Sequence, residues 1–421
     1  MIKKENNFDV VVVGAGPAGM MAAGRAAELG RYVLLIEKNQ RPGIKLLLTG
    51  KGRCNITNAE FNLRKFVENY GKNGSFLFHA LAVFGPQQVI DFFDAAGLKT
   101  KIERGQRVFP YSDKSEDVLK ILLNYLAKNK VKVIFDSEVV KVNCQNREIK
   151  NLLLKNGEMI TAQNYIFSTG GKSYPSTGST GDGFKWAKNL GHRIEKLSPA
   201  LVPLKIKENW VKRLQGLSLK NVRVNVFQKG KKQISKLGEC LLTHFGLSGP
   251  IILDISKQVG ELLKNGPAEI SLDLKPALDF AKLDKRVQSD FKKYQNKSFK
   301  NCLNDLLPRM LIPVMVKLSG IGPEKKANNV TREERHNLVK LLKNLKMTLV
   351  GLLGFDSAIV TSGGISLKEI DDKTMKSKVI DNLFLAGEII DVDGPSGGFN
   401  LQVCWSTGYL AGENAAKYCL S

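Results

Sequence analysis

Three closely spaced glycines give the strongest indication of chemistry in this chain. Gly14, Gly16 and Gly19 stand in the sequence GAGPAG, directly after the apolar run FDVVVV, and Glu37 follows eighteen positions after Gly19. The first glycine of such a motif permits a tight turn, the second lets the backbone approach a pyrophosphate, and the third lets helix and strand pack closely. The helix then begins at the phosphates, and the acidic residue meets a ribose hydroxyl. The motif predicts a dinucleotide site.

Two other interpretations of this N-terminal segment are weaker. A glycine-rich turn in an ordinary βα unit gives no reason for the strand, the helix and the acidic residue to stand where the motif requires them. Lys3 and Lys4 precede an apolar run, as in a secretory signal, but four glycines from Gly14 to Gly24 and the immediate return to a strand argue against one. No apolar run approaches the length of a membrane span, so we expect no membrane partner.

The cysteines are scattered through the chain. None of the six forms a CxxC pair, and no cluster of histidines and cysteines has metal-ligand spacing. Disulfides are rare in the reducing cytoplasm. This usage predicts a cytoplasmic protein without a metal site.

The positive charge of the chain is large and uneven. The net charge is +24, and residues 196–350 hold 30 lysines and arginines against 13 acidic residues. Such a basic segment favours a polyanionic partner, and RNA is the one expected for a cytoplasmic protein of this kind. The alternative is a lysine-rich composition whose charges are merely solvated.

The elements that must position these residues change in character along the chain. At 421 residues the chain is too long for one ordinary core. Its first part alternates strands and helices, a middle part has short alternating strands, and a basic helical part follows. The fold class expected is α/β, with a Rossmann-type nucleotide domain interrupted by a β-barrel and a small helical domain. The boundaries expected are 1–195 and 366–421 for the nucleotide domain, 196–277 for the barrel, 278–350 for the helical insert, and 351–365 for a return strand of the barrel.

The C-terminal region favours a flavin over a nicotinamide as the resident dinucleotide. A strand ending in LAGE (385–388) leads into the glycine-rich segment GPSGGFN and a long helix. This arrangement offers a carboxylate for a ribityl hydroxyl and helix N–H groups that would stabilise negative charge on a reduced flavin. The sequence STGG at Ser168–Gly171 is a further strand that ends in glycines. We see no second GxGxxG motif, so NADPH or NADH is expected only as a transient reductant.

Five sequence blocks resemble one family over essentially the whole chain: GAGPAG, GIKLLLTGKGRCNITN, STGGKSYPSTGSTGDG, GECLLTHFGLSGPIIL and LAGEIIDVDGPSGGFNLQ. The chain resembles the bacterial FAD flavoproteins called BaiN-like or YhiN-like, also described as NAD(P)/FAD-dependent oxidoreductases or aminoacetone-oxidase-family enzymes. The resemblance implies a glutathione-reductase-type FAD domain with an inserted barrel similar to those of translation factors.

The resemblance also implies the residues that contact FAD. Those at its AMP half are Gly14, Ala15, Gly16, Pro17, Ala18, Gly19, Glu37 and Lys38. Those along the pyrophosphate and flavin are Lys45, Gly50, Gly52, Arg53, Cys54 and Asn55. The adenine is expected near Val139 or Val140, with Thr169 and Gly170 close by. The site is completed by Gly387, Glu388, Gly398, Phe399, Asn400 and Leu401.

The family implies three kinds of substrate: a uridine of large-subunit ribosomal RNA, which is reduced to dihydrouridine, a small amine, and a steroid-like double bond. The basic middle segment favours the uridine of 23S ribosomal RNA. Cys54 and His244 are the candidate acids, and Arg107, Phe109 and Tyr111 are candidates for the substrate side. An oxidase or reductase of a small molecule is the first alternative. A ribosome-assembly factor that binds RNA and holds FAD structurally is the second.

Overall fold

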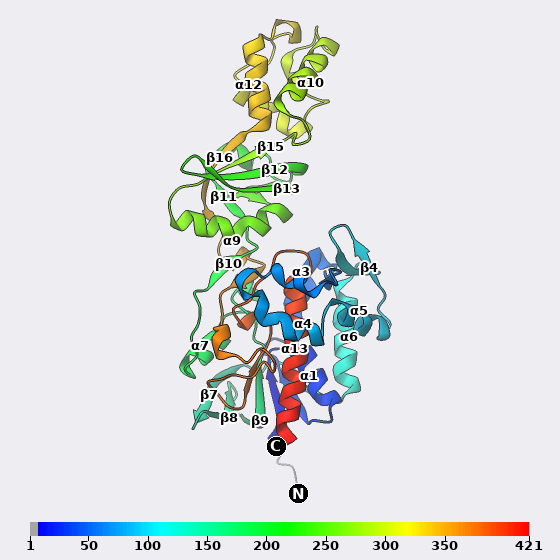
Figure 1. The fold of residues 1–421 in the computed structure, drawn as a ribbon, viewed down its shortest axis with the longest axis vertical. Helices are drawn as coiled ribbons and strands as arrows, with labels where there is room; N and C mark the ends of the chain where they lie inside the picture. The colour runs from blue at the N-terminus through cyan, green and yellow to red at the C-terminus, as the bar shows by residue number, and fades with distance from the viewer. Residues whose placement is uncertain (1–6, 421) are drawn as a thin grey trace. The chain divides into compact units, whose positions relative to one another are not determined.

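The computed structural model describes residues 7–420, and the chain divides into two compact units. Unit 1 comprises the chain through Ala200 together with the residues from Phe355 onward, and unit 2 comprises Leu201–Gly354. A contiguous segment therefore interrupts the first unit. The α/β class with a Rossmann-type domain is confirmed, and Figure 1 shows both units as ribbons.

The core of unit 1 is a seven-stranded sheet in which β1 (Asn7–Val13) lies between β2 (Val33–Ile36) and β9 (Met159–Phe167). β1 is parallel to both neighbours, and β6 is parallel to β2. The second half of β9 pairs with β18 (Leu383–Leu385), which returns from the far side of unit 2 in sequence. Val10, Val11 and Val12 are fully buried, as expected for a parallel strand covered on both faces. The remaining strands of this sheet are β6 (Lys132–Ile134), β7 (Val139–Gln145) and β8 (Glu148–Leu154).

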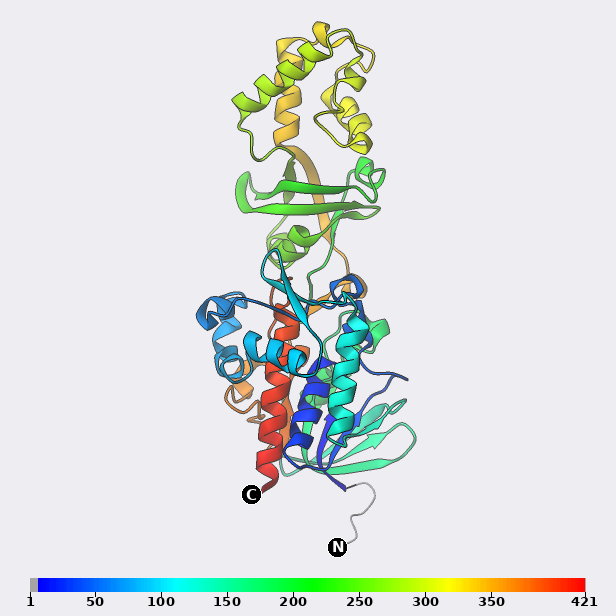
Figure 2. The same ribbon diagram turned by 90° about the vertical axis from the view of Figure 1, so that its right-hand side faces the viewer.

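Helices α1 (Pro17–Glu28) and α13 (Phe399–Lys417) lie side by side against this sheet, as Figures 1 and 2 both show. A Cβ atom on Gly408 would lie 2.4 Å from the Ala18 carbonyl oxygen, and one on Gly412 would lie 2.3 Å from that of Ala22. The two helices can approach this closely only because glycines face alanines. The first and last α-helices described thus form one packed pair.

Shorter elements complete unit 1. A second sheet, β3-β5-β4, is built from β3 (Thr57–Asn58), β4 (Thr100–Glu103) and β5 (Arg107–Pro110), and β10 (Ser198–Ala200) pairs with β17 (Val360–Ser362). The other α-helices are α2 (Ile44–Leu48), α3 (Leu63–Glu68), α4 (Phe78–Val83), α5 (Pro86–Ala95), α6 (Ser115–Lys128) and α7 (Asp182–Asn189). The 3-10 helices are η1 (Thr49–Gly52), η2 (Gly71–Leu77), η3 (Pro175–Thr177), η7 (Phe355–Ser357), η8 (Leu367–Glu369), η9 (Gly387–Ile389) and η10 (Tyr418–Leu420).

Unit 2 consists of a closed barrel and a group of helices. The strand order of the barrel is β11-β14-β13-β12-β15-β16, and β16 closes it by pairing with β11. Its strands are β11 (Leu204–Ile206), β12 (Ser218–Gln228), β13 (Lys231–Thr243), β14 (Gly246–Ser248), β15 (Glu269–Asp273) and β16 (Leu345–Leu352). The helices of unit 2 are α8 (Asn209–Lys212), α9 (Pro250–Lys264), α10 (Phe280–Lys293), α11 (Ile312–Ser319) and α12 (Arg332–Lys343), with η4 (Phe299–Asn301), η5 (Arg309–Leu311) and η6 (Ala327–Asn329).

One buried ion pair joins α12 to the barrel strand β15. Lys343 Nζ donates to Asp273 Oδ2 at 2.6 Å and to the carbonyl oxygens of Lys275 and Leu278 at 3.0 and 2.7 Å. All three donor positions of the ammonium group therefore have acceptors, which is the condition under which a buried charge is tolerated.

Three sequence expectations differ from the structure. Residues 351–365 do not form the return strand of the barrel, because the strand that closes it is β16, at Leu345–Leu352. Residues 345–350 alternate buried and exposed side chains, as a strand does. The predicted helical insert, 278–350, included these residues because they directly follow the basic helix. The glycines and asparagines of residues 43–58 predict an ordered loop, but the segment contains the short helix α2. The sequence VKVIFDSEVVKVN at 131–143 predicts a hairpin, but β6 pairs with β2 and β7 pairs with β8.

One stretch passes a length and hydropathy test for a membrane-spanning helix, namely residues 71–95. It consists of three successive helices, η2, α4 and α5, and Phe84 between the last two has φ −139° and ψ 73°. Its apolar side chains include Leu81, Val89 and Phe93, which are buried in the core of unit 1. Core packing accounts for its hydropathy.

Candidate dinucleotide site

The three glycines after β1 meet the three requirements of a dinucleotide loop. Gly14 has φ +101°, a backbone that disfavours any side chain. A Cβ atom on Gly19 would lie 1.9 Å from the Gly14 carbonyl oxygen, so α1 packs directly on the turn. A Cβ atom on Gly16 would meet nothing within 4 Å. The backbone at Gly16 is therefore open to a ligand, and Pro17 starts α1 without losing a helical hydrogen bond.

Glu37 lies beside this loop and fixes its shape. Its Oε2 accepts from the backbone N–H of Ala15 at 2.8 Å, and its Oε1 accepts from the backbone and side-chain amides of Asn39 at 2.9 and 2.8 Å. A carboxylate oxygen can accept more than one hydrogen bond, so Glu37 can still meet a ribose hydroxyl. Lys38 is turned away from the loop, since its ammonium group contacts Thr180 and Asp182 at 2.6 and 2.8 Å.

A buried hydroxyl next to the glycine loop lacks a partner in the described residues. Thr169 Oγ1 is inaccessible and has no hydrogen bond, and the Thr169 Cα lies 3.1 Å from where a Cβ on Gly14 would stand. Buried hydroxyls in folded proteins are normally satisfied. The open backbone at Gly16 fits a bound dinucleotide, whereas the Thr169 hydroxyl is covered by α7, where a Cβ atom on Gly183 would lie 2.1 Å from it. Gly170, with φ +72°, follows in the same turn.

A second part of the site forms where the segment 52–58 meets the start of α13. A Cβ atom on Gly398 would lie 2.3 Å from the Thr57 carbonyl carbon and oxygen, so the two backbones touch. The Trp405 indole donates to the Ile56 carbonyl oxygen at 2.9 Å and holds the segment on α13. With its NH₂ group facing the carbonyl oxygens of Thr57 and Val108, the Asn55 amide accepts from the Gly398 N–H at 2.9 Å.

The N-terminus of α13 emerges from this contact. Its first N–H groups, at Phe399, Asn400 and Leu401, have no acceptor within the helix. The side chain of Asn400 is already used, because it bonds the Gly394 N–H at 2.9 Å and the carbonyl oxygens of Gly394 and Pro395 at 2.9 and 3.1 Å. Phe399 is buried against Phe66 and Tyr70. What α13 offers a ligand is therefore backbone N–H groups and a helix dipole.

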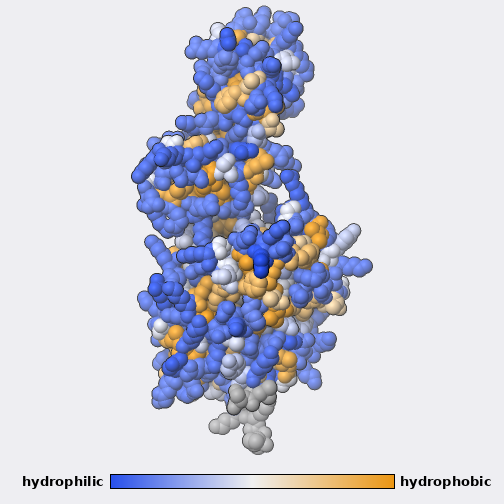
Figure 3. All heavy atoms as spheres, viewed as in Figure 1, coloured by the Kyte–Doolittle hydropathy of each residue, from blue (hydrophilic) through white to orange (hydrophobic). Residues whose placement is uncertain are grey.

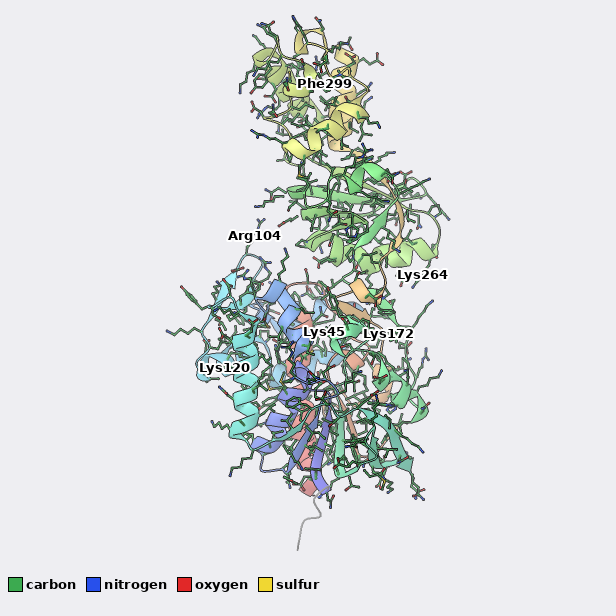
Figure 4. All side chains as sticks on the ribbon, turned by 180° about the vertical axis from the view of Figure 1, so that it is seen from behind. Lys45, Arg104, Lys120, Lys172, Lys264 and Phe299 are labelled. Atoms are coloured by element: carbon green, nitrogen blue, oxygen red, sulfur yellow. The ribbon has the colours of Figure 1, made fainter. Side chains whose placement is uncertain are left out.

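Lys45 and Glu388 form a polar network in unit 1. Lys45 Nζ contacts Glu388 Oε2 at 2.7 Å and Ser173 Oγ at 2.6 Å, while Glu388 Oε1 accepts from Ser173 Oγ and the Thr361 N–H at 2.8 and 2.7 Å. Figure 4 shows Lys45 within unit 1. The adjacent Gly387 has φ +76°, and its N–H donates to Thr407 on α13 at 2.9 Å. This network holds the Lys45 ammonium group beside the Glu388 carboxylate, which the sequence analysis predicts to bind a ribityl hydroxyl.

Arg53 is held by acids on the small sheet. Its guanidinium bonds Asp113 through Nε at 2.7 Å and Glu103 through Nη2 at 2.5 Å, and it lies 4.1 Å from the centre of the Phe109 ring. The hydrogen bond to Glu103 is the main reason that the Arg53 pKa is raised. Arg53 therefore positions the loop that contains Gly50 and Gly52, and a direct contact with FAD would require it to leave both acids.

Cys54 is fully buried and has φ +59°. Burial raises the pKa of its thiol to about 12. The thiol therefore stays protonated at neutral pH, but in this conformation a substrate cannot reach it. The other candidate acid, His244, is an exposed residue between β13 and β14 in unit 2. The two candidates thus belong to different units.

The remaining predicted residues divide between the interior and the surface. Ala18 and Val139 are buried, whereas Val140 is exposed on the other face of β7. Phe109 is buried under Arg53, and the Arg107 Nε donates to the Arg104 carbonyl oxygen at 3.0 Å. Tyr111 is 71% exposed. Among residues 7–420, no three histidine, cysteine or acidic side chains form a group that could hold a metal ion.

Sequence reasoning missed Asn58, Ser173 and Thr361, whose side chains connect separate parts of the site. Each makes at least one contact with a residue more than a hundred positions away, so no local pattern marks it. For Asn58 and Ser173 the sequence did offer an indication, because both stand inside the glycine-rich blocks.

Comparison with known proteins agrees with this geometry. The model of the family described as HI0933-like protein Rossmann domain matches residues 8–414. The chain belongs to this family. The HI0933-like proteins are flavoprotein oxidoreductases with an FAD-binding Rossmann domain.

Two curated relatives of this HI0933-like chain align over nearly their full length. The 3-dehydro-bile acid delta(4,6)-reductase of Clostridium scindens is 31% identical, covering 96% of this chain and 98% of the relative. The ribosomal RNA dihydrouridine synthase of Escherichia coli is 30% identical, covering 97% and 99%. Among solved structures, a 3-ketosteroid-delta4-(5alpha)-dehydrogenase of Rhodococcus jostii has a TM-score of 0.56 at 17% identity, covering 99% and 98% of the two chains. That likeness shows the fold alone.

Proposed function

We propose that this HI0933-like flavoprotein reduces a uridine of 23S ribosomal RNA to dihydrouridine, with NADPH or NADH as the source of hydride. The observation that carries the proposal is the charge of unit 2. Residues 201–354 hold 29 lysines and arginines against 13 acidic residues. A small uncharged or singly charged substrate gives no reason for such a unit, whereas an RNA backbone does.

The acids of unit 2 neutralise only part of this charge. Lys293, Arg335 and Lys343 are paired with Asp305, Asp284 and Asp273. Exposed cations of the helical part without an ion-pair partner in the described residues are Lys285, Lys292, Lys297, Arg309, Lys317, Lys326, Arg332 and Lys340. The surface of unit 2 in Figure 3 is largely hydrophilic. These side chains supply the sequence-independent contacts to phosphate that an RNA-binding surface needs.

The reaction adds a hydride to C6 of the uracil ring and a proton to C5, while the nicotinamide is oxidised. When bound, FAD would carry the hydride between the two. The residues of this chain would hold the cofactor through the open backbone at Gly16, the Glu37 carboxylate and the start of α13. A base in an RNA helix must leave its stack to reach such a site.

Two groups are proposed for the proton at C5. An acid must lie within hydrogen-bond reach of the atom it protonates. The complete burial of Cys54 favours a packing role for its thiol, while His244 is accessible. We therefore propose His244 ahead of Cys54. His244→Gln should lower turnover more than RNA affinity, and Cys54→Ala should leave turnover within a few-fold of the parent protein.

The test is to incubate FAD-loaded protein and NADPH with protein-free 23S ribosomal RNA from cells lacking this modification, and to measure dihydrouridine by nucleoside mass spectrometry. Dihydrouridine formation supports the proposal. Flavin reduction without dihydrouridine, on both mature and precursor RNA, refutes it. Salt-sensitive RNA binding without any turnover would instead indicate an assembly factor.

A small-molecule substrate is the second candidate, because a relative named for bile-acid reduction is as similar as the one named for RNA reduction. In that case NADPH oxidation should depend on an added steroid enone, or oxygen consumption on an added amine such as aminoacetone. RNA should then neither compete nor be modified. Substituting unpaired lysines of unit 2 separates the two candidates, since only the RNA reaction should slow.

A further inference from the structure

The hairpin formed by β4 and β5 in unit 1 carries more positive charge than its acids can neutralise. Its cations are Lys99, Lys101, Arg104, Arg107 and Lys114, and its acids are Glu103 and Asp113. Asp113 is bonded by Lys101 at 2.7 Å and by Arg53, and these bonds lower the Asp113 pKa. Glu103 is bonded by Arg53, which lowers the Glu103 pKa. Both acids are thus occupied below the tip of the hairpin.

The tip itself presents two arginines. Arg104 is exposed and has no ion-pair partner in the described residues, and Figure 4 shows it pointing outward. Arg107 has a side chain 42% exposed, and its nearest carboxylate oxygen, on Glu103, is 4.0 Å away. Tyr111 follows β5 at the base of the hairpin, where its N–H donates to the Lys99 carbonyl oxygen at 2.9 Å, so its exposed ring lies at the end opposite the tip. The tip therefore offers two cations, which are the side chains that bind the phosphates of a nucleic acid.

A single buried amide connects this tip to the start of α13. Asn58 Nδ2 donates to the Gly105 carbonyl oxygen at the hairpin tip and to the Gly397 carbonyl oxygen before α13, both at 3.1 Å. Asn58 is 5% exposed, and it pairs in register with Arg107. The tip therefore lies next to the helix start that would receive the flavin.

We infer that Arg104 and Arg107 bind the RNA phosphates flanking the target nucleotide, and that Asn58 is the positioning residue that fixes this hairpin relative to the cofactor site. The inference rests on the proposed function and adds an RNA contact outside the basic unit 2. An unpaired segment fits this tip because its two arginines are open to solvent over a short surface. A duplex would be contacted over a longer and more regular surface.

The experiment measures the affinity of FAD-loaded protein for a fluorescent single-stranded oligouridine RNA, as a function of salt. Each lost phosphate contact should reduce the salt slope by about 0.7, so Arg104→Ala/Arg107→Ala should reduce it by about 1.4 and weaken binding about 25-fold at 0.1 M salt. Arg104→Lys/Arg107→Lys keeps the charge and should restore most of the slope. Lys120→Ala, which removes an exposed charge on α6, is the matched control and should bind like the parent protein (Figure 4).

The outcomes separate the hairpin from the function. A parent protein that forms dihydrouridine while the double alanine variant keeps the parent slope overturns the hairpin inference and leaves the function intact. A parent protein that neither binds nor modifies RNA refutes the function, and the RNA inference falls with it. If the double variant then lowers turnover of an anionic steroid, the arginines bind a carboxylate, which also overturns the inference. The melting temperature and flavin spectrum establish that each variant is folded.

Discussion

The substitution Gly16→Ala separates ligand binding from folding at the glycine loop. Gly16 has φ −78° and ψ −178°, a backbone that alanine adopts without strain, and an added Cβ meets nothing within 4 Å. The protein without cofactor should therefore keep its stability to within about 1 kcal/mol, because the reduced freedom of the unfolded chain is offset by the poorer N-cap that alanine gives α1. The methyl group, however, would occupy the space through which a pyrophosphate reaches the backbone.

The expected loss of affinity follows from the hydrogen bonds at stake. A backbone N–H bond to a charged group contributes about 1.5–3 kcal/mol, and about 1.4 kcal/mol corresponds to a factor of ten. Gly16→Ala should raise the Kd for FAD by about 10- to 100-fold. The assay is quenching of flavin fluorescence on titration of cofactor-free protein, alongside urea unfolding.

Two matched glycine variants make this test specific. Gly30 also has open space around it but has φ +82°, so Gly30→Ala should lose about 1 kcal/mol of stability and bind FAD normally. Gly19→Ala should fail to fold properly, since its Cβ would lie 1.9 Å from a carbonyl oxygen. An unchanged Kd for FAD in a folded Gly16→Ala variant would refute the assignment of this loop to the pyrophosphate.

Three further predictions concern stability and reactivity. Burial lowers the pKa of His192, whose Nε2 lies 2.8 Å from Ser377 Oγ. As the pH drops below about 6.5 the unfolded chain therefore binds a proton before the folded protein does, and the free energy of unfolding should fall. His192→Gln should flatten this pH dependence, measured by urea unfolding. Lys343→Met leaves Asp273 buried and unpaired and should destabilise unit 2 by about 3 kcal/mol, measured by thermal unfolding, whereas Lys340→Met on the exposed face of α12 should cost little. A thiol reagent at pH 7.5 should modify the exposed Cys144 long before Cys54, and mass spectrometry of peptides would show the order.

The sequence was sufficient for the class of fold and for the conformations of the glycine loop, because both depend on local rules. A strand, a left-handed glycine and a helix of small residues follow one another within Asn7–Glu28. The closing strand of the barrel was misplaced for the opposite reason. The alternation at Leu345–Val350 directly follows an amphipathic helix, and only pairing with β11 and β15 distinguishes the strand.

The candidate site was less predictable, because its side chains are held by distant partners. Nothing adjacent to Arg53 indicates that Glu103 and Asp113 bind it, and a free Arg53 was the natural expectation for a cofactor loop. Cys54 follows Arg53 in the sequence, a setting typical of a reactive thiol, yet burial raises the Cys54 pKa. Burial and ion pairing are properties of the assembled fold. The sequence motif would read the same whether Arg53 were paired or free and whether Cys54 were buried or exposed.

The packing of α1 against α13 has a consequence for the order in which the chain can mature. Unit 2 is one contiguous segment, so it can fold as soon as it leaves the ribosome. Unit 1 lacks β18 and α13 until the residues after Phe355 have been made, and its core stays open until then. If FAD binds where the glycine loop meets α13, as proposed, the cofactor is retained only after that closure, so unit 2 should be folded before the oxidoreductase becomes active.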